Sequence, residues 1–319
     1  MIIHKGAFIR QIIEILKKKP GKKVFVDCTC GTGSHTLAIL ENFSEEVEKI
    51  FCIDIDCEIL DVAKMRINSY LQEIREQKEK NPSLIFINDN YKNLKNIVDC
   101  KADVIILDSG VSLYHLKKRE RGFGFDSPFV DMRYDRNMPF TALDVIRKSS
   151  NEELERILIN YAGIKKPQKI VKILKEYIEQ EHIKVPLGHY LQQHLKKVRA
   201  RLHPATLIFQ ALRIYVNKEL DNLELFLRTV PDVLNQLGML FVITYHSLED
   251  KIVKSYFRNY SKLGEFSLFN RKVIKPTYRE ILENKCIRSA KLRILYRNEN
   301  LQEEIYNRTV SPCDCRAGK

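Results

Sequence analysis

The chain contains no long hydrophobic run. None of its apolar segments approaches the roughly 18 consecutive residues that a membrane-spanning helix needs. The N-terminal residues 1–23 place Ile9, Ile12, Ile13 and Leu16 at helical spacing, and no small-residue cleavage site follows them as in a secretory signal. The absence of both signals predicts a protein without membrane contact that stays in the cytoplasm.

Paired cysteine motifs are also missing. The eight cysteines include no C-x-x-C, and several lie within strand-like apolar runs. This pattern favours reduced thiols in the core of a cytosolic protein over a disulfide framework. Cys313 and Cys315 lie in a polar C-terminal tail without a second pair of ligands, so we expect no metal site there.

Acidic residues are outnumbered by basic ones. The chain has 54 lysines and arginines against 41 aspartates and glutamates, which gives a net charge of +13. Such an excess points to a polyanionic partner, although a lysine-rich proteome would shift every protein in the same direction. The distribution favours a partner, because residues 113–203 alone hold 19 basic and 11 acidic residues, a net +8.

Short runs rich in valine and isoleucine alternate with helical patterns. Such runs are typical of buried parallel strands, and the alternation implies right-handed βαβ units in a doubly wound α/β sheet. We expect five strands at residues 23–30, 49–56, 83–90, 102–110 and 239–247, and an antiparallel closing pair at 271–276 and 290–297.

The strand pattern stops between residues 113 and 203. Residues 151–163 have apolar residues at helical spacing, with Asn151 as the expected N-cap and Gly163 as the stop, and similar patterns follow. We therefore predict three parts: residues 1–112 as the first part of the α/β domain, 113–203 as an all-helical insertion that faces the polyanion, and 204–319 as the second part with a C-terminal tail.

The stretch VFVDCTCGTGSHT, residues 24–36, combines a glycine turn with an acid. Gly31 and Gly33 allow a tight turn from strand to helix and close approach of a ligand to the backbone. The dinucleotide fingerprint G-x-G-x-x-G needs a third glycine where Thr36 stands. A dinucleotide is therefore the less favoured ligand.

Three of the predicted strands contain an aspartate at their carboxyl ends, namely Asp27, Asp54 and Asp108. Because ligands of a doubly wound sheet bind beyond these ends, we expect the three carboxylates to line one crevice. Their charge disfavours a diphosphate but suits a ribose, an ammonium and a sulfonium together, as in S-adenosylmethionine. Tyr91 follows the third strand, where it can stack on an adenine or simply pack its own helix.

Seven segments together resemble a known family. In chain order they are DCTCGTGSHT, IDID, DVIILDSGVS, RGFGFDSPFVDMRYD, HPATLIFQALRIYVNKEL, YHSLEDKIVK and RSAKLR. From His4 to about Arg297 the chain is similar to the bacterial 16S ribosomal RNA cytosine-N4 methyltransferases of the MraW type. The resemblance implies a Rossmann-like class I S-adenosylmethionine-dependent methyltransferase with an inserted all-helical domain.

The resemblance also implies a substrate and a set of contact residues. The family methylates the N4 amine of a cytidine in 16S ribosomal RNA near the decoding centre, so the expected partner is 16S rRNA or the small ribosomal subunit, with the insertion on its phosphates. A monomer and a homodimer both stay open, and no metal is implied. The expected S-adenosylmethionine contacts are Gly33, Ser34, His35, Asp54, Tyr91, Asp108 and His115.

Several positions depart from the family's usual pattern. Ser34 replaces the second glycine of G-G-H, Ser109 and Leu113 replace a leucine and a serine after the fourth strand, and His115 replaces a glutamine. None of these departures removes a strand-end carboxylate. We expect them to affect the adenine-side contacts and the rate more than the binding of the cofactor.

Two residues are candidates for the chemistry. The amine must be aligned with the methyl group, and its hydrogens must be accepted as charge develops; Asp108 ends the strand where amino-methyltransferases place such acceptors. His246 follows the fifth strand and can contact the base or carry a proton, unless it serves only to cap the next helix. Asp131, Arg133 and residues 121–125 are expected to shape the target pocket.

Three other functions are compatible with parts of this pattern. The first is a dinucleotide-dependent dehydrogenase, which Thr36 and the three acids disfavour. The second is a non-catalytic RNA-binding protein that retains the methyltransferase fold. The third is a methyltransferase that acts on another nucleic acid or a small molecule, which the basic insertion disfavours.

Overall fold

The computed structural model describes residues 6–74, 82–179, 185–195 and 204–299. The strands are β1 (Val24–Asp27), β2 (Lys49–Asp54), β3 (Ser83–Asn88), β4 (Ala102–Asp108), β5 (Leu234–Thr244), β6 (Phe266–Leu268) and β7 (Lys291–Arg297). The α-helices are α1 (Ile9–Lys17), α2 (Ser34–Phe43), α3 (Cys57–Ile74), α4 (Leu94–Ile97), α5 (Leu113–Lys117), α6 (Ala142–Lys148), α7 (Asn151–Ala162), α8 (Gln168–Glu179), α9 (Leu187–His194), α10 (Pro204–Asn217), α11 (Glu219–Val233), α12 (Ser247–Lys262) and α13 (Tyr278–Glu283).

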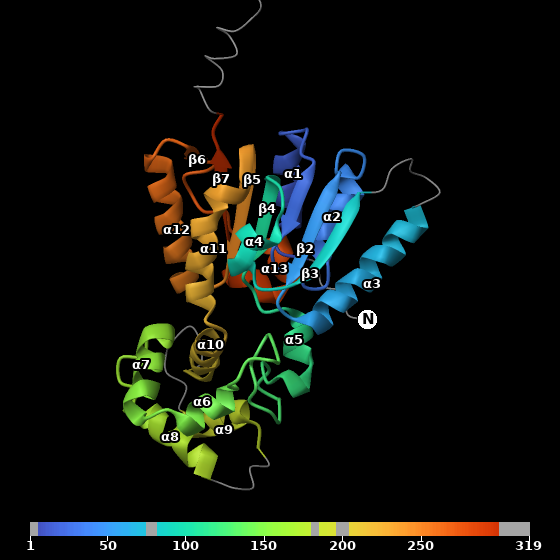
Figure 1. Cartoon of the computed structure of the whole chain (residues 1–319). Helices are drawn as coiled ribbons and strands as arrows, with labels where there is room; N and C mark the ends of the chain where they lie inside the picture. The colour runs from blue at the N-terminus through green and yellow to red at the C-terminus, as the bar shows by residue number, and fades with distance from the viewer. Residues whose placement is uncertain (1–5, 75–81, 180–184, 196–203, 300–319) are drawn as a thin grey trace, which may run out of the picture.

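The strands form one sheet in the order β3-β2-β1-β4-β5-β7-β6. Strands β1 to β5 are parallel, and β7 runs antiparallel to both β5 and β6. Helices α1, α2 and α3 pack on one face of the sheet, and α4, α11 and α12 pack on the other (Figure 1). This three-layer architecture confirms the predicted doubly wound α/β fold, and both faces are buried because alternate strand residues enter the two cores.

The closing pair of strands differs from the expectation. β7 matches the expected last strand, but its partner β6 lies at 266–268 and not at 271–276. Within the expected segment, only Ile274 makes a bridge, to Leu292. Residues 271–276 lie in a loop that runs along β7. The sequence pattern alone does not distinguish such a loop from an edge strand.

A second core lies below the sheet and is built mainly from helices, with Phe123, Val130 and Met132 added from the preceding loops (Figure 1). It joins buried residues of α6 to α9 with those of α10, which links this helical body to α11 on the sheet. No strand occurs between 113 and 203 among the residues that the structure describes. Because α10 contributes to the helical core, the chain returns to the sheet domain gradually, and the boundary at residue 203 stays a prediction.

Helix α7 shows how its ends are determined. Ser150, not Asn151, is the N-cap, and its hydroxyl accepts a hydrogen bond from the Glu153 amide at 3.2 Å. Gly163 ends the helix with φ 66°, as expected. Ser150 and Asn151 are both good caps, so the sequence alone leaves an uncertainty of one residue.

The cysteine and membrane predictions are tested by the same structure. Cys28, Cys30 and Cys52 are buried free thiols, as predicted, whereas Cys57 and Cys286 are exposed. Cys313 and Cys315 lie outside the described residues. Among the helices of the described ranges, none has the length and hydrophobicity to cross a membrane.

Candidate active site

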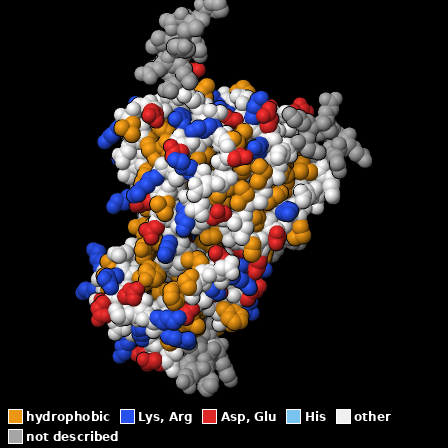
Figure 2. Space-filling model, in the orientation of Figure 1, with side chains coloured by type: hydrophobic (Ala, Val, Ile, Leu, Met, Phe, Trp, Pro, Cys, Tyr) orange, Lys and Arg blue, Asp and Glu red, His pale blue; other side chains and the backbone are white. Residues whose placement is uncertain are grey.

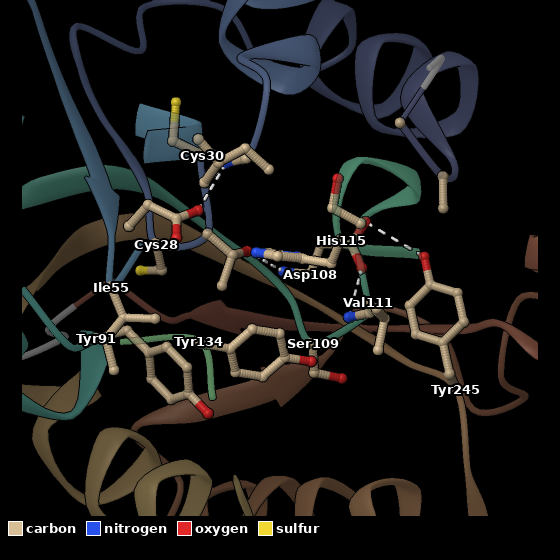
Figure 3. Close-up of a pocket in the computed structure, with 18 of the residues that line it drawn as sticks. Cys28, Cys30, Ile55, Tyr91, Asp108, Ser109, Val111, His115, Tyr134 and Tyr245 are labelled. Atoms are coloured by element: carbon tan, nitrogen blue, oxygen red, sulfur yellow. Dashed lines mark hydrogen bonds between the residues drawn. The ribbon is translucent and has the colours of Figure 1, made fainter. Parts of the chain in front are cut away.

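A cavity opens at the carboxyl ends of the parallel strands, between the sheet and the helical body (Figure 3). Its walls come from the turn after β1, the ends of β2, β4 and β5, and the starts of α5, α11 and α12. Of the seven residues expected to contact S-adenosylmethionine, six line it: Ser34, His35, Asp54, Tyr91, Asp108 and His115. The parallel topology brings these distant segments to one edge of the sheet.

The seventh expected residue, Gly33, does not line the cavity. Its φ of 81° lies in the left-handed region, and a Cβ atom there would be 3.0 Å from the Cδ1 atom of Ile67 on α3. Gly33 therefore allows the turn and the packing of α3 against it, while Gly31 forms part of the cavity wall. The cofactor contact expected for Gly33 stays a prediction, and the cavity wall at this turn is formed by its neighbours.

Asp54 is the buried acid at the end of β2. Its Oδ2 atom accepts a hydrogen bond from the Gly31 amide at 2.8 Å, and its Oδ1 atom accepts one from the Asp56 amide at 3.0 Å. Burial raises the pKa of Asp54 to about 7, against an ordinary value of 3.8. Each carboxylate oxygen keeps a lone pair for a further donor, so the site suits the two hydroxyls of a ribose.

Asp108 is the acid at the end of β4. Its Oδ1 atom accepts a hydrogen bond from the Gly110 amide at 3.1 Å, and its Oδ2 atom accepts one from the Tyr245 hydroxyl at 3.4 Å (Figure 3). Burial raises the pKa of this carboxyl, and His35 opposes the rise. Asp108 is therefore held in place and is a better proton acceptor than an exposed aspartate.

Asp27 does not belong to the cavity wall, contrary to the expectation. Its Oδ2 atom accepts a hydrogen bond from the Thr36 hydroxyl at 2.9 Å, and the side chain is only 3% exposed. Asp27 thus ties the end of β1 to the first turn of α2, and burial raises its pKa. Strand-end position predicted all three acids equally, but only Asp54 and Asp108 line the cavity.

A buried ionic cluster supports the cavity from the side of α5. The Asp56 carboxylate accepts a hydrogen bond from His115 Nε2 at 2.7 Å and lies 2.7 Å from the Arg121 guanidinium. Burial opposes the charge of Asp56, but His115 and Arg121 outweigh burial and lower its pKa to about 2. Burial lowers the pKa of His115, so a neutral imidazole donates to this carboxylate. Sequence reasoning missed Asp56, although it follows Asp54 in the same motif.

Aromatic rings form another wall of the cavity. Tyr91 packs edge-on against Phe226 at 5.6 Å, and Tyr134 stacks on Phe123 at 5.1 Å. Figure 3 shows Tyr91 and Tyr134 beside each other below the strand ends. The Tyr134 hydroxyl is buried and has no hydrogen-bond partner within the described part of the chain. Both rings offer flat surfaces for a base, and Tyr134 was not singled out from the sequence.

His246 has the capping role that was the simpler alternative. Its Nδ1 atom accepts a hydrogen bond from the Glu249 amide at 3.4 Å at the start of α12. His246 does not line the cavity, and its participation in catalysis stays a prediction. Glu249 does line the cavity, and its Oε2 atom accepts a hydrogen bond from the Tyr245 amide at 2.8 Å.

Two further charged residues of the cavity region were missed. Glu219, at the start of α11, lines the cavity and receives two hydrogen bonds from Arg213, at 2.8 and 3.0 Å. Both residues belong to the segment HPATLIFQALRIYVNKEL, whose helical pattern gave no sign of a buried ion pair. Asp131 and Arg133 pair with each other at 2.7 Å and do not line the cavity.

Comparison with known proteins decides the family. Residues 1–298 match the MraW methylase family. The chain belongs to this family. The ribosomal RNA small subunit methyltransferase H of Pseudothermotoga lettingae is 38% identical over 303 residues, which cover 93% of this chain and 99% of the relative. The protein of the same name from Dictyoglomus thermophilum is 36% identical, over 93% of this chain and 98% of the relative.

A solved structure of an rRNA methylase from Streptococcus thermophilus also aligns with this member of the MraW methylase family. The alignment covers 94% of this chain and 99% of the other, with a TM-score of 0.37 and 12% identity. The family assignment rests on the sequence matches, which extend from the first residue to the end of β7.

Proposed function

We propose that this protein uses S-adenosylmethionine to methylate the N4 amine of a cytidine in small-subunit ribosomal RNA. The observation that carries the proposal is the cavity at the strand ends, with the buried carboxylate of Asp54 and the half-buried carboxylate of Asp108 beside a glycine turn. Its support is the membership in the MraW methylase family and the name of its relatives, which identifies them as small subunit methyltransferases. The site of action would be the cytoplasm, where ribosomal RNA is available.

The cofactor would be held by the turn after β1 and by the end of β2. Asp54 would accept hydrogen bonds from the ribose, and the backbone at Gly31 permits close approach. Tyr91 would lie against the adenine, and Ser34, His35 and His115 are the other wall residues of the expected set. The carboxylates of Asp54 and Asp108 favour a positively charged ligand in a region of reduced dielectric.

Asp108 would act on the acceptor amine. Bound S-adenosylmethionine supplies a methyl group on a positively charged sulfur. As the new bond to N4 forms and the bond to sulfur breaks, the amine becomes cationic and must lose one proton. Asp108 would accept a hydrogen bond from this amine and then its proton, which passes on to solvent; the raised pKa of Asp108 favours this transfer. Gly110 and Tyr245 keep the carboxylate in position for the transfer.

The helical body would hold the RNA, as the charge of residues 113–203 suggests. Lys165 and Lys166 lie on the exposed link between α7 and α8, and no acidic side chain of the described ranges pairs with them. Such lysines can neutralise phosphates without reading the sequence. The target cytidine would leave its stack to reach the cavity between this body and the sheet.

The direct test is methyl transfer to 16S rRNA, offered free and within small subunits from cells that lack the protein. We expect N4-methylcytidine in the digested RNA, measured by mass spectrometry of the nucleosides. Methylation at another atom of the base, or at no cytidine, would contradict the proposal. The separation into two surfaces predicts that Asp54→Ala loses affinity for S-adenosylmethionine, whereas a Lys165→Glu and Lys166→Glu double variant loses affinity for RNA only.

A further inference from the structure

A second basic feature lies on the sheet domain, away from the helical body. A small hollow forms between α12, the loop after β6 and strand β7. Five of its lining residues are cationic and none is acidic: Lys254, Arg258, Arg271, Lys272 and Arg293. We refer to this feature as the edge hollow. Figure 2 shows lysine and arginine side chains over α12 on the left flank of the molecule.

Most of these cations have no acidic partner among the described residues. Lys254 and Arg258 lie one turn apart on α12, Arg271 and Lys272 lie in the loop, and all four side chains are exposed. No aspartate or glutamate of the described ranges forms an ion pair with any of the four. Only Arg293 is paired, through its Nε atom to Asp250 at 2.7 Å. Neighbouring like charges repel one another, so an anion in the edge hollow would relieve a repulsion that the protein leaves uncompensated.

Two elements, α12 and β7, connect the edge hollow with the cavity at the strand ends. Glu249 lines the cavity in the first turn of α12, and Lys254 lies five residues further, which is about 8 Å along a helix. Ile287 also lines the cavity, and the chain runs from there directly into β7, which contains Arg293. A strand of RNA that delivers its base to the cavity therefore has phosphates within reach of the edge hollow.

Size and surroundings favour a single phosphate of a nucleic acid. The hollow has a volume of about 40 Å³, room for roughly three waters at about 15 Å³ each, which suits a small anionic group such as a phosphate. Phe269, beside it in the loop, is 40% exposed. Exposed aromatic rings next to cations are typical of surfaces that bind single-stranded nucleic acid, because a base stacks on the ring while its phosphate contacts the cation.

We propose that the edge hollow binds a backbone phosphate of the substrate RNA, as a contact separate from the helical body. This inference rests on the proposed function, since it takes small-subunit ribosomal RNA as the ligand. In single-stranded nucleic acid each neutralised phosphate contributes about 0.7 to the slope of log affinity against log salt. One lost contact therefore weakens binding about fivefold at 0.1 M salt, and two lost contacts weaken it about 25-fold.

The test compares two double variants with the same change in charge. Lys254→Glu with Arg271→Glu removes two cations of the edge hollow, and Lys17→Glu with Lys18→Glu removes two exposed cations at the end of α1. Binding to in vitro transcribed 16S rRNA is measured at several salt concentrations between about 0.05 and 0.3 M, so that the slope of log affinity against log salt can be determined. S-adenosylmethionine affinity and thermal melting are measured for both variants to verify their fold.

We expect about 25-fold weaker RNA binding and a salt slope shallower by about 1.4 for the edge-hollow variant only. Its affinity for S-adenosylmethionine should equal that of the wild type. An equal loss in the α1 variant would overturn the inference, because net charge alone would then explain it, and so would unchanged binding in the edge-hollow variant. Where the wild-type protein does not bind the free transcript, the same comparison is made with small subunits from cells that lack the protein; a wild-type protein that binds neither would refute the proposed function instead.

Discussion

The high pKa of Asp54 makes cofactor binding depend on pH in a direction that can be predicted. Burial raises this pKa to about 7, so roughly one tenth of the carboxyl groups are ionised at pH 6 and nine tenths at pH 8. Only the ionised form can accept a hydrogen bond at both oxygens from a ribose. Affinity for S-adenosylmethionine should therefore be about tenfold weaker at pH 6 than at pH 8.

Titration calorimetry tests this expectation in two buffers that differ in their enthalpy of ionisation. At pH 7 about half of the Asp54 groups carry a proton, so binding should release about half a proton per molecule. The variant Asp54→Asn serves as the control, because it retains the size of the side chain and cannot titrate. Subtracting its pH profile removes the titration of the ligand and of the other groups in the cavity.

The same shift affects the stability of the free protein. Between pH 3.8 and about 7 the folded state holds a proton on Asp54 that the unfolded state has lost. The free energy of unfolding should therefore fall as the pH rises through this interval, and Asp54→Asn should remove that part of the fall.

Two results of the binding experiment would refute the reasoning. A wild-type affinity for S-adenosylmethionine that does not change with pH, or a proton taken up on binding, would show that Asp54 is already ionised in the free protein.

Three further predictions concern the support of the cavity. Arg121→Leu removes the guanidinium beside the buried Asp56 carboxylate and should lower the free energy of unfolding, measured in urea, by about 3 kcal/mol. Lys118→Leu, at the more exposed ion pair with Glu58, should lower it by less than about 1 kcal/mol. Equal losses would contradict a special role of the buried pair. Gly33→Ala should destabilise by about 2 kcal/mol, and Gly163→Ala, which also has positive φ but open space around its Cβ position, by about 1 kcal/mol. Asp108→Asn should lower kcat roughly hundredfold without a change in RNA affinity, and an unchanged kcat would exclude Asp108 as the proton acceptor.

The sheet of this protein was predictable from its sequence to a large degree. Five parallel strands and the last antiparallel strand lie where the valine and isoleucine runs predicted them, because a strand buried on both faces requires a continuous apolar run. The edge strand β6 was not predictable in the same way. It is three residues long and is defined by its pairing with β7, and no run of apolar residues marks it.

The cavity shows the same division between local and tertiary information. Strand-end position predicted Asp54 and Asp108, and the glycine turn predicted the approach of a ligand. Strand-end position did not distinguish these two acids from Asp27. The direction of a side chain depends on the helix that packs beside it, and here the Thr36 hydroxyl on α2 donates a hydrogen bond to the Asp27 carboxylate. The bond between Asp56 and Arg121 joins segments 65 residues apart in the chain, and no local pattern marks such a pair.

The sequence by itself determined the alternation of strands and helices, the excess of positive charge between residues 113 and 203, and the motifs of the MraW methylase family. These properties depend on residues close together in the chain, where periodicity and spacing act directly. Tertiary structure decided which acids face the cavity, which cations remain unpaired at the edge hollow, and that His246 caps a helix. Such outcomes depend on which distant side chains meet, and only the packing of the whole chain settles them.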